Sequence, residues 1–278
     1  MNTQNTLKII TGLALAIGAM PRAQAITGCT NNMLSGAYGW QLSGTLTPSL
    51  SGGVAGAVTP PKALSRISSG APGTVSVAAG LATVFLDGGG NLFGNAVLIL
   101  DGTSSEGPVT GAYNVNDDCS LSITLTDSGG GTQHFDGVVV NRGDGVNLLQ
   151  TDPGVGVSGS LRHARGFCQT SDIGGGFGFR SAGTIAASGP FSSIGSINLD
   201  GQGNVTASES RFGNGAYSQV VSAGSITVNS DCSLNMTLAA NTDGSLVNYR
   251  GIILNSTKDM FLLRSDDGAT ITGTVVAQ

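Results

Sequence analysis

The stretch Cys29-Thr-Asn-Asn-Met-Leu-Ser-Gly-Ala-Tyr-Gly-Trp40 decides the fold of this chain, because it occurs twice. Its second copy is Cys168-Gln-Thr-Ser-Asp-Ile-Gly-Gly-Gly-Phe-Gly-Phe179. Two further stretches, Gly111–Leu121 and Gly224–Leu234, share the pattern Val-Asn-x-Asp-Cys-Ser-Leu. Self-similarity of this kind indicates a tandem duplication, and it sets the domain count before any other argument.

The duplication predicts two domains, at residues 26–163 and 168–278, with a short linker near 162–167. Counterparts lie 139 residues apart at the start of the copies and 113 residues apart after residue 80, so the first copy holds 26 additional residues. These residues fall within 47–80, a stretch rich in Pro, Gly, Ser and Ala. Such a composition is typical of a surface loop, and we expect an insertion there.

We expect residues 1–25 to be a signal peptide. Lys8 precedes an apolar run over Ile9–Met20, and Ala23-Gln24-Ala25 is a small-x-small cleavage site. The sequence therefore predicts export to the periplasm or the extracellular space, where cysteines meet oxidising conditions.

Lipid anchoring at Cys29 is the alternative, since Ile26-Thr-Gly-Cys29 fits a loose lipid-attachment motif. Two observations oppose it. The polar segment Pro21–Gln24 separates the apolar run from this motif, and Cys29 has an internal counterpart, Cys168, which cannot be lipidated. We therefore expect a structural role for both cysteines and no lipid anchor.

Composition narrows the possible partners. Without Lys8 and Arg22 the mature chain carries 10 basic and 17 acidic residues, a net charge of −7. Nucleic-acid binding needs clustered Lys and Arg, so we expect no nucleic-acid partner. No stretch after the signal peptide approaches the roughly 18 apolar residues of a membrane-spanning helix. The composition does not indicate an oligomeric state.

The mature chain reads as an all-β protein. Apolar residues alternate in places, as at Tyr38, Trp40 and Leu42, and glycine-rich turns separate the candidate strands. The first copy contains these strand candidates: Ala37–Leu46, Ala82–Leu86, Leu92–Leu100, Val109–Val115, Ser120–Thr126, Gln133–Val140, Val146–Gln150 and Val155–Leu161. Short connections favour antiparallel pairing, and closure removes exposed edges. We therefore predict two eight-stranded meander barrels in tandem, with a β-sandwich as the alternative.

The four cysteines favour two disulfides within the copies. Each copy has one cysteine before its first strand and one before its fifth, and in a meander all odd strands begin at the same rim. Four cysteines allow three pairings. Only Cys29–Cys119 with Cys168–Cys232 lets each domain fold alone, so we predict this pairing.

Residues able to carry chemistry are few. His134 and Asp136 share one face of a strand, where a carboxylate could orient a general base, but we favour the simpler interpretation as an exposed polar face. The other histidine, His163, lies at the seam between the copies. We find no serine placed as a nucleophile and no zinc spacing, and we expect no metal and no cofactor.

The paired patterns Leu-Asp-Gly-x-Gly-Asn and Gly-Trp/Phe-x-x-x-Gly-Thr resemble those of uncharacterised secreted bacterial β-proteins, for which no activity is established. In architecture, each copy is similar to lipocalin-like and allene-oxide-cyclase-like barrels. The lipocalin Gly-x-Trp signature is matched only by Gly39-Trp40 and, in the second copy, by Gly178-Phe179. This resemblance implies a barrel fold and transfers no ligand or catalytic residue.

Barrels of this size often enclose an apolar cavity, so we expect a secreted, non-enzymatic binding protein for a small apolar or amphipathic ligand. A cyclase-type or isomerase-type enzyme and a cell-surface or matrix structural protein are the alternatives. The candidate ligand-binding residues are Tyr38, Trp40, Tyr113, His134 and Asp136. We expect binding to concentrate in the first copy, which alone holds the single Trp, both histidines and the insertion.

Overall fold

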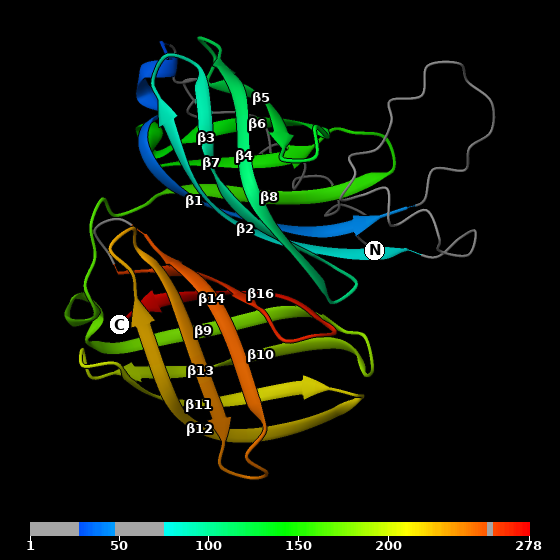
Figure 1. Ribbon diagram of the computed structural model, residues 1–278, viewed down its shortest axis with the longest axis vertical. Coiled ribbons are helices and arrows are strands. Elements are labelled where there is room, and N and C mark those ends of the chain that lie inside the picture. Colours follow the sequence, from blue (N-terminus) through cyan, green and yellow to red (C-terminus); the bar gives the residue numbers. More distant parts are fainter. Residues whose placement is uncertain (1–27, 48–74, 255–257) are drawn as a thin grey trace, which may run out of the picture.

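The computed structural model describes residues 28–47, 75–254 and 258–278. The expected signal peptide and most of the expected insertion lie outside these ranges. The described residues form two closed, eight-stranded antiparallel barrels, one after the other along the chain (Figure 1). The all-β tandem-barrel prediction is therefore confirmed, and the β-sandwich alternative is wrong.

Barrel 1 follows chain order, and its last strand pairs with its first. Its strands are β1 (Ser35–Leu46), β2 (Ser76–Asp87), β3 (Asn91–Leu100), β4 (Thr103–Val115), β5 (Ser120–Asp127), β6 (Thr132–Val140), β7 (Gly145–Gln150) and β8 (Val155–His163). Short 3-10 helices, η1 (Asn31–Met33) and η3 (Asn141–Gly143), lie before β1 and between β6 and β7.

Barrel 2 repeats this order and closes through β16 and β9. Its strands are β9 (Gly175–Ile185), β10 (Gly189–Leu199), β11 (Asn204–Gly213), β12 (Ala216–Val228), β13 (Ser233–Ala240), β14 (Leu246–Ile253), β15 (Met260–Arg264) and β16 (Ala269–Ala277). The 3-10 helix η4 (Thr170–Ile173) precedes β9. No helix in the described ranges is long and apolar enough to cross a membrane.

Two strands begin earlier than the sequence predicts. β2 starts at Ser76 rather than Ala82, so residues 76–80 of the expected insertion are strand. This segment lacks alternation because both of its faces are covered, one by the barrel interior and the other by barrel 2. β4 starts at Thr103 rather than Val109, because backbone pairing with β3 holds a polar, exposed segment in the sheet.

Both barrels carry the predicted within-copy disulfides, Cys29–Cys119 and Cys168–Cys232, each with its two Cα atoms 5.0 Å apart. In each barrel the bridge ties the segment before the first strand to the start of the fifth. We call this end the disulfide rim and the opposite end the open rim.

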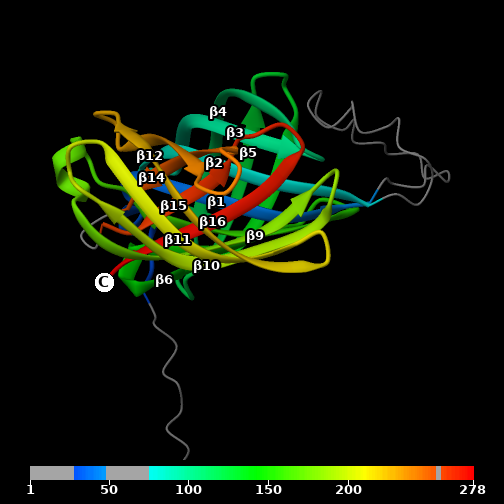
Figure 2. The same cartoon turned by 90° about the horizontal axis from the view of Figure 1, so that it is seen from below.

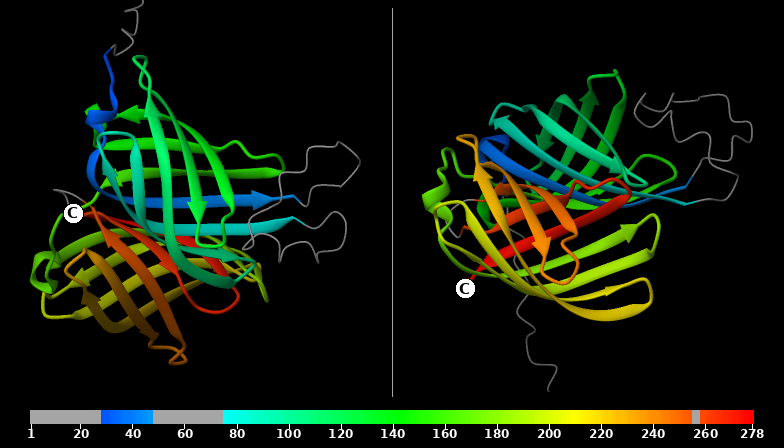
Figure 3. Two further views of the ribbon diagram at one scale, coloured as in Figure 1. Left: turned by 45° about the horizontal axis from the view of Figure 1, so that its top comes forward. Right: turned by 60° about the horizontal axis from the view of Figure 1, so that its bottom comes forward.

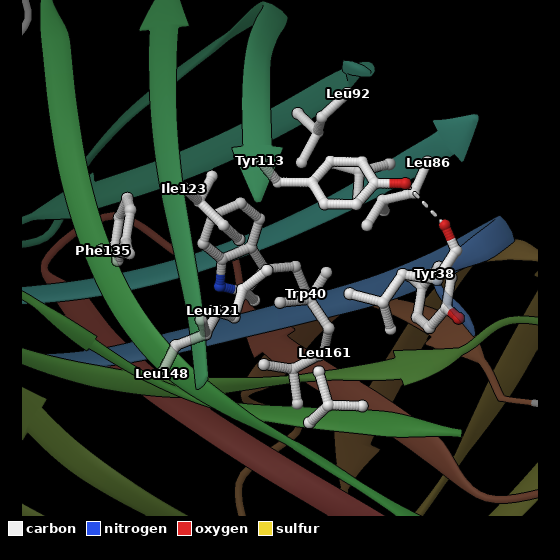
Figure 4. Packing of buried hydrophobic residues seen from close by; sticks show 14 of the residues in the cluster. Tyr38, Trp40, Leu86, Leu92, Tyr113, Leu121, Ile123, Phe135, Leu148 and Leu161 are labelled. Carbon is white, nitrogen blue, oxygen red and sulfur yellow. Dashed lines mark hydrogen bonds between the residues drawn. The ribbon is translucent and has the colours of Figure 1, made fainter. Parts of the chain in front are cut away.

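Large side chains of one phase point into each barrel interior. In barrel 1, Tyr38 and Trp40 are buried with Ile123 and Phe135, and the Trp40 indole meets the Phe135 ring edge-on, with centroids 5.0 Å apart (Figure 4). In barrel 2 the rings of Phe179 and Tyr249 make the equivalent edge contact at 6.1 Å. The aromatic matches between the copies are thus packing partners across each barrel.

The barrels pack side by side through their outer walls (Figures 2 and 3). Leu81 and Ile99, from β2 and β3 of barrel 1, lie in one buried cluster with Ile252, Phe261 and Leu263 from β14 and β15 of barrel 2. These side chains point away from their own barrel interiors, yet all are buried. The outer walls therefore form a second apolar layer, which explains why apolar residues occur on both faces of these strands.

Polar contacts fix the register of this interface. The Gln41 side-chain amide donates hydrogen bonds to the backbone carbonyls of Leu262 and Gly273, at 3.0 and 2.8 Å. At the open rim, the Gly102 N–H donates to the Thr270 hydroxyl at 2.8 Å, and the Gly102 carbonyl accepts from the Gly268 N–H at 3.0 Å. The β3–β4 turn is thereby tied to the β15–β16 turn.

Candidate functional site

A pocket of about 530 Å³ occupies the half of barrel 1 nearest the open rim. This volume lies within the roughly 300–1,000 Å³ typical of small-molecule sites. The described lining residues are Trp40, Leu42, Gly80, Leu81, Ala82, Ala96, Val97, Leu98, Ser105, Glu106, Gly107, Pro108, Val109, Leu125, Asp127, Ser128, Gly129 and Gln133. A void of about 20 Å³ adjoins it and shares four lining residues with it: Leu42, Gly80, Leu98 and Gln133.

The pocket exists because small residues stand where a barrel of this size could hold large ones. Gly80, Ala82, Ala96 and Gly107 face the interior of the open-rim half and leave space above Trp40. A side chain added at Gly80 would find only ordinary contacts, the nearest being the Leu42 Cβ at 3.5 Å. The cavity therefore results from the small residues at these strand positions.

The pocket is apolar at depth and polar at its edge. Trp40, Ala82, Val109 and Leu125 form the deep wall, whereas the turn after β5 contributes polar groups beside the polar first half of β4. Asp127, the last residue of β5, is the charged residue at the start of this turn. Its Oδ1 accepts hydrogen bonds from the Gly129 and Gly131 N–H groups at 2.8 and 2.9 Å.

Two polar atoms in the pocket wall have no partner among the described residues: Trp40 Nε1 and Asp127 Oδ2, both buried. A buried, unpaired donor or acceptor costs about 1–3 kcal/mol. Glu106, the other acid of the lining, is compensated, because its Oε2 accepts from the Arg250 guanidinium of barrel 2 at 2.6 Å. Asp127 is thus the uncompensated charge among the described lining residues.

Of the residues predicted to bind ligand, Trp40 lines the pocket, whereas Tyr38 and Tyr113 lie near the disulfide rim. The Tyr38 hydroxyl donates to the Gly143 carbonyl at 2.9 Å, and burial raises the pKa of Tyr38 to about 12. The Tyr113 hydroxyl donates to the Leu34 carbonyl at 2.8 Å and accepts from the Gly88 N–H at 2.9 Å. Both rings therefore tie turns of that rim to the barrel.

His134 and Asp136 lie on the outer face of β6, exposed to solvent. His134 pairs with Asp152 rather than Asp136, with 2.8 Å between Nδ1 and Oδ1. Burial raises the pKa of Asp152, but hydrogen bonds from Gln150 and His134 outweigh burial and hold it below the usual value. The structure thus separates the predicted polar pair from the predicted aromatic residues.

The equivalent half of barrel 2 is polar. Ser181, Ser193, Glu209, Arg211 and Ser222 stand where barrel 1 has Leu42, Gly80, Ala96, Leu98 and Val109. The Arg211 Nη2 donates to Glu209 Oε1 at 2.5 Å, and the Ser181 and Ser193 hydroxyls lie 2.9 Å apart. Burial, together with the charge of Glu209, raises the pKa of Tyr249 on the facing wall. The two interiors have therefore diverged at the positions that form the pocket.

Asp127 and Gln133 are the site residues that sequence reasoning missed. Both follow the inward phase of their strands, since Asp127 continues the series Leu121, Ile123, Leu125 and Gln133 shares the phase of Phe135. A polar residue at an inward strand position that is otherwise apolar is the sequence feature that indicates both residues. Among the described residues, no group of three or more His, Cys, Asp or Glu could hold a metal ion.

No protein-family model matches the chain, and a search of curated proteins finds no significant relative. The function must therefore be argued from the site itself.

Proposed function

We propose that this protein binds a small amphipathic molecule in barrel 1 without transforming it. The observation that carries the proposal is the pocket of about 530 Å³, which has an apolar depth and a polar edge. An apolar body would lie against Trp40, Val109 and Leu125, and burying it would supply most of the affinity, at roughly 25 cal/mol per Å² of apolar surface.

The polar edge favours a particular head group. Asp127 is an uncompensated acid among the described lining residues, and a carboxylate accepts hydrogen bonds but cannot donate them. A hydroxyl or amine on the ligand satisfies this chemistry, whereas a ligand carboxylate would be repelled. We therefore propose an apolar alcohol or amine in preference to a fatty acid.

The alternatives receive less support. An enzyme acting in the cavity would need groups able to move protons, and His134, Asp136 and Tyr113 all lie away from the pocket lining. The described lining holds two acids, Asp127 and Glu106, and Glu106 is paired with Arg250, so Asp127 would have to act without a second acid or base. A purely structural protein would be expected to carry large side chains at these inward positions, as barrel 2 does with its Glu209–Arg211 pair. The two disulfides fit an oxidising, extracytoplasmic compartment, which supports the proposed export.

The test uses N-phenyl-1-naphthylamine, an apolar probe whose fluorescence rises on leaving water. We expect saturable binding to the mature protein with quenching of Trp40, the single tryptophan of the chain. Ala96→Phe should weaken binding at least tenfold by filling the pocket. Asn95→Phe is the matched control, because it adds the same ring on the exposed face of the same strand.

Absence of saturable binding, or equal binding by the two variants, would show that the pocket is not the ligand site. Far-UV circular dichroism checks that both variants keep the barrel. Competition by dodecanol, dodecylamine and dodecanoate then tests the head group, and the proposal expects dodecanoate to compete least.

A further inference from the structure

The contact between the two barrels joins different walls. Barrel 1 contributes the outer face of β1–β3, called here the head face, and barrel 2 contributes the outer face of β14–β16, called here the tail face. Because the barrels are copies of each other, barrel 2 also has a wall that corresponds to the head face, and barrel 1 also has a wall that corresponds to the tail face. The chain thus keeps a free head face on barrel 2, formed by β9–β11, and a free tail face on barrel 1, formed by β6–β8.

The free head face retains large apolar residues at the contact positions. Ile194 and Phe212 stand where barrel 1 has Leu81 and Ile99, which are buried in the interface. Ile194 is 67% exposed and Phe212 is 48% exposed, and Tyr217, beside Phe212 in the sheet, is 65% exposed. In Figure 1, β11 and β12 lie at the end of the molecule away from barrel 1.

The free tail face shows the same property. Val138 and Leu149 stand where barrel 2 has Ile252 and Leu263, which are buried against barrel 1. Val138 is 52% exposed and Leu149 is 54% exposed. Neither large apolar side chain has a packing role inside its own barrel, because both point outward.

The polar residues that join the two barrels also have counterparts that can form hydrogen bonds. Gln41, which donates to two carbonyls of barrel 2, corresponds to Arg180, another side-chain donor. The ion pair of Glu106 with Arg250 corresponds to Gln219 and Asp136, which can form a hydrogen bond. The two free faces are therefore complementary in donors and acceptors as well as in apolar side chains.

Close approach is preserved too. A Cβ added at Gly39 would lie 2.9 Å from a Leu254 methyl carbon of barrel 2, so this contact needs a glycine, and its counterpart Gly178 is also glycine. Other positions have become polar. Ser192 and Ser210 replace Ala79 and Val97, and Asn147 replaces Phe261. These replacements make a contact weaker than the one within the chain.

We propose that the mature chain associates head to tail with further copies of itself, through the barrel 2 head face of one copy and the barrel 1 tail face of the next. The contact repeats the one that already joins the two barrels. It is heterologous, because different surfaces meet, so it leaves one free face at each end and can build chains or close into a ring.

The experiment measures the mass of the mature protein by light scattering and sedimentation over a concentration series. We expect a reversible rise in mass beyond the dimer. Ile194→Asp blocks the head face and Leu149→Asp blocks the tail face, so each variant alone should remain monomeric. Phe93→Asp changes a comparably exposed apolar residue on β3 of barrel 1, outside both free faces, and this variant should associate like the wild type.

Mixing the two blocked variants gives the decisive result. Each retains the face that the other lacks, so the mixture should form a one-to-one dimer and nothing larger. A wild-type monomer at the highest soluble concentration would overturn the proposal. So would association that both substitutions leave unchanged, a mixture that stays monomeric, or a mixture that grows beyond the dimer.

Discussion

The β3–β4 turn should couple the two barrels measurably, and Gly102→Ala tests this. Gly102 has φ +81°, and an added Cβ would lie 2.2 Å from the Gly268 Cα of barrel 2, so the turns must separate. Separation would break the hydrogen bonds of Gly102 with Thr270 and Gly268. Backbone strain of about 1–2 kcal/mol adds to about 1 kcal/mol for each of the two lost bonds, for a destabilisation of about 3–4 kcal/mol.

Gly130→Ala is the matched control, because Gly130 has φ +79° in another hairpin turn of the open rim and an added Cβ would meet nothing within 4 Å. It should cost only the strain, about 1–2 kcal/mol. Urea unfolding followed by Trp40 fluorescence reports barrel 1 directly. If both variants shift the midpoint equally, the contact between the turns contributes nothing in solution and the reasoning fails.

Two further predictions concern the disulfide rim. Replacing Cys29 and Cys119 by Ala should destabilise barrel 1 by about 4–5 kcal/mol, and replacing Cys168 and Cys232 should destabilise barrel 2 by nearly as much. The two effects are similar because the loop entropy depends only on the logarithm of the sequence separations, which are 90 and 64 residues. Urea midpoints of the two variants that fall far apart would contradict this. Since burial raises the pKa of Tyr38 from 10.0 to about 12, its neutral form contributes stability that is complete below pH 10 and is lost, by about 2–3 kcal/mol, as pH rises to 12. Tyr38→Phe should flatten that part of the pH profile of unfolding, and an unchanged slope would count against the assignment.

Sequence reasoning worked where a strand has one covered face. The series Leu121, Ile123, Leu125 alternates with exposed residues because solvent lies opposite the barrel interior. The series Tyr38, Trp40, Leu42 also points inward, although Gly39 and Gln41 between them contact barrel 2. β2, one of the two strands that the sequence predicts too short, is covered on both faces. Its extra covering comes from barrel 2, which no local pattern can reveal.

The sequence of one copy alone does not predict the pocket, for a related reason. A cavity follows from side chains that are missing, such as those at Gly80 and Ala96, and small residues look alike in loops and in cavity walls. Comparison of the two copies gives a better indication of the pocket, since Ala96 and Leu98 align with Glu209 and Arg211. Charged residues at inward positions of one copy mark the places where the other copy has room.

The connection between β1 and β2 has a consequence for how the protein can change over evolutionary time. Leu46 and Ser76, which pair directly, hold both of its ends at the open rim, and the β1–β2 register depends on the strands alone. Insertions and deletions there can accumulate without disturbing the closed sheet, because loop-closure entropy rises slowly with length. The closed sheet can therefore be inherited unchanged while the connection between Leu46 and Ser76 varies in length.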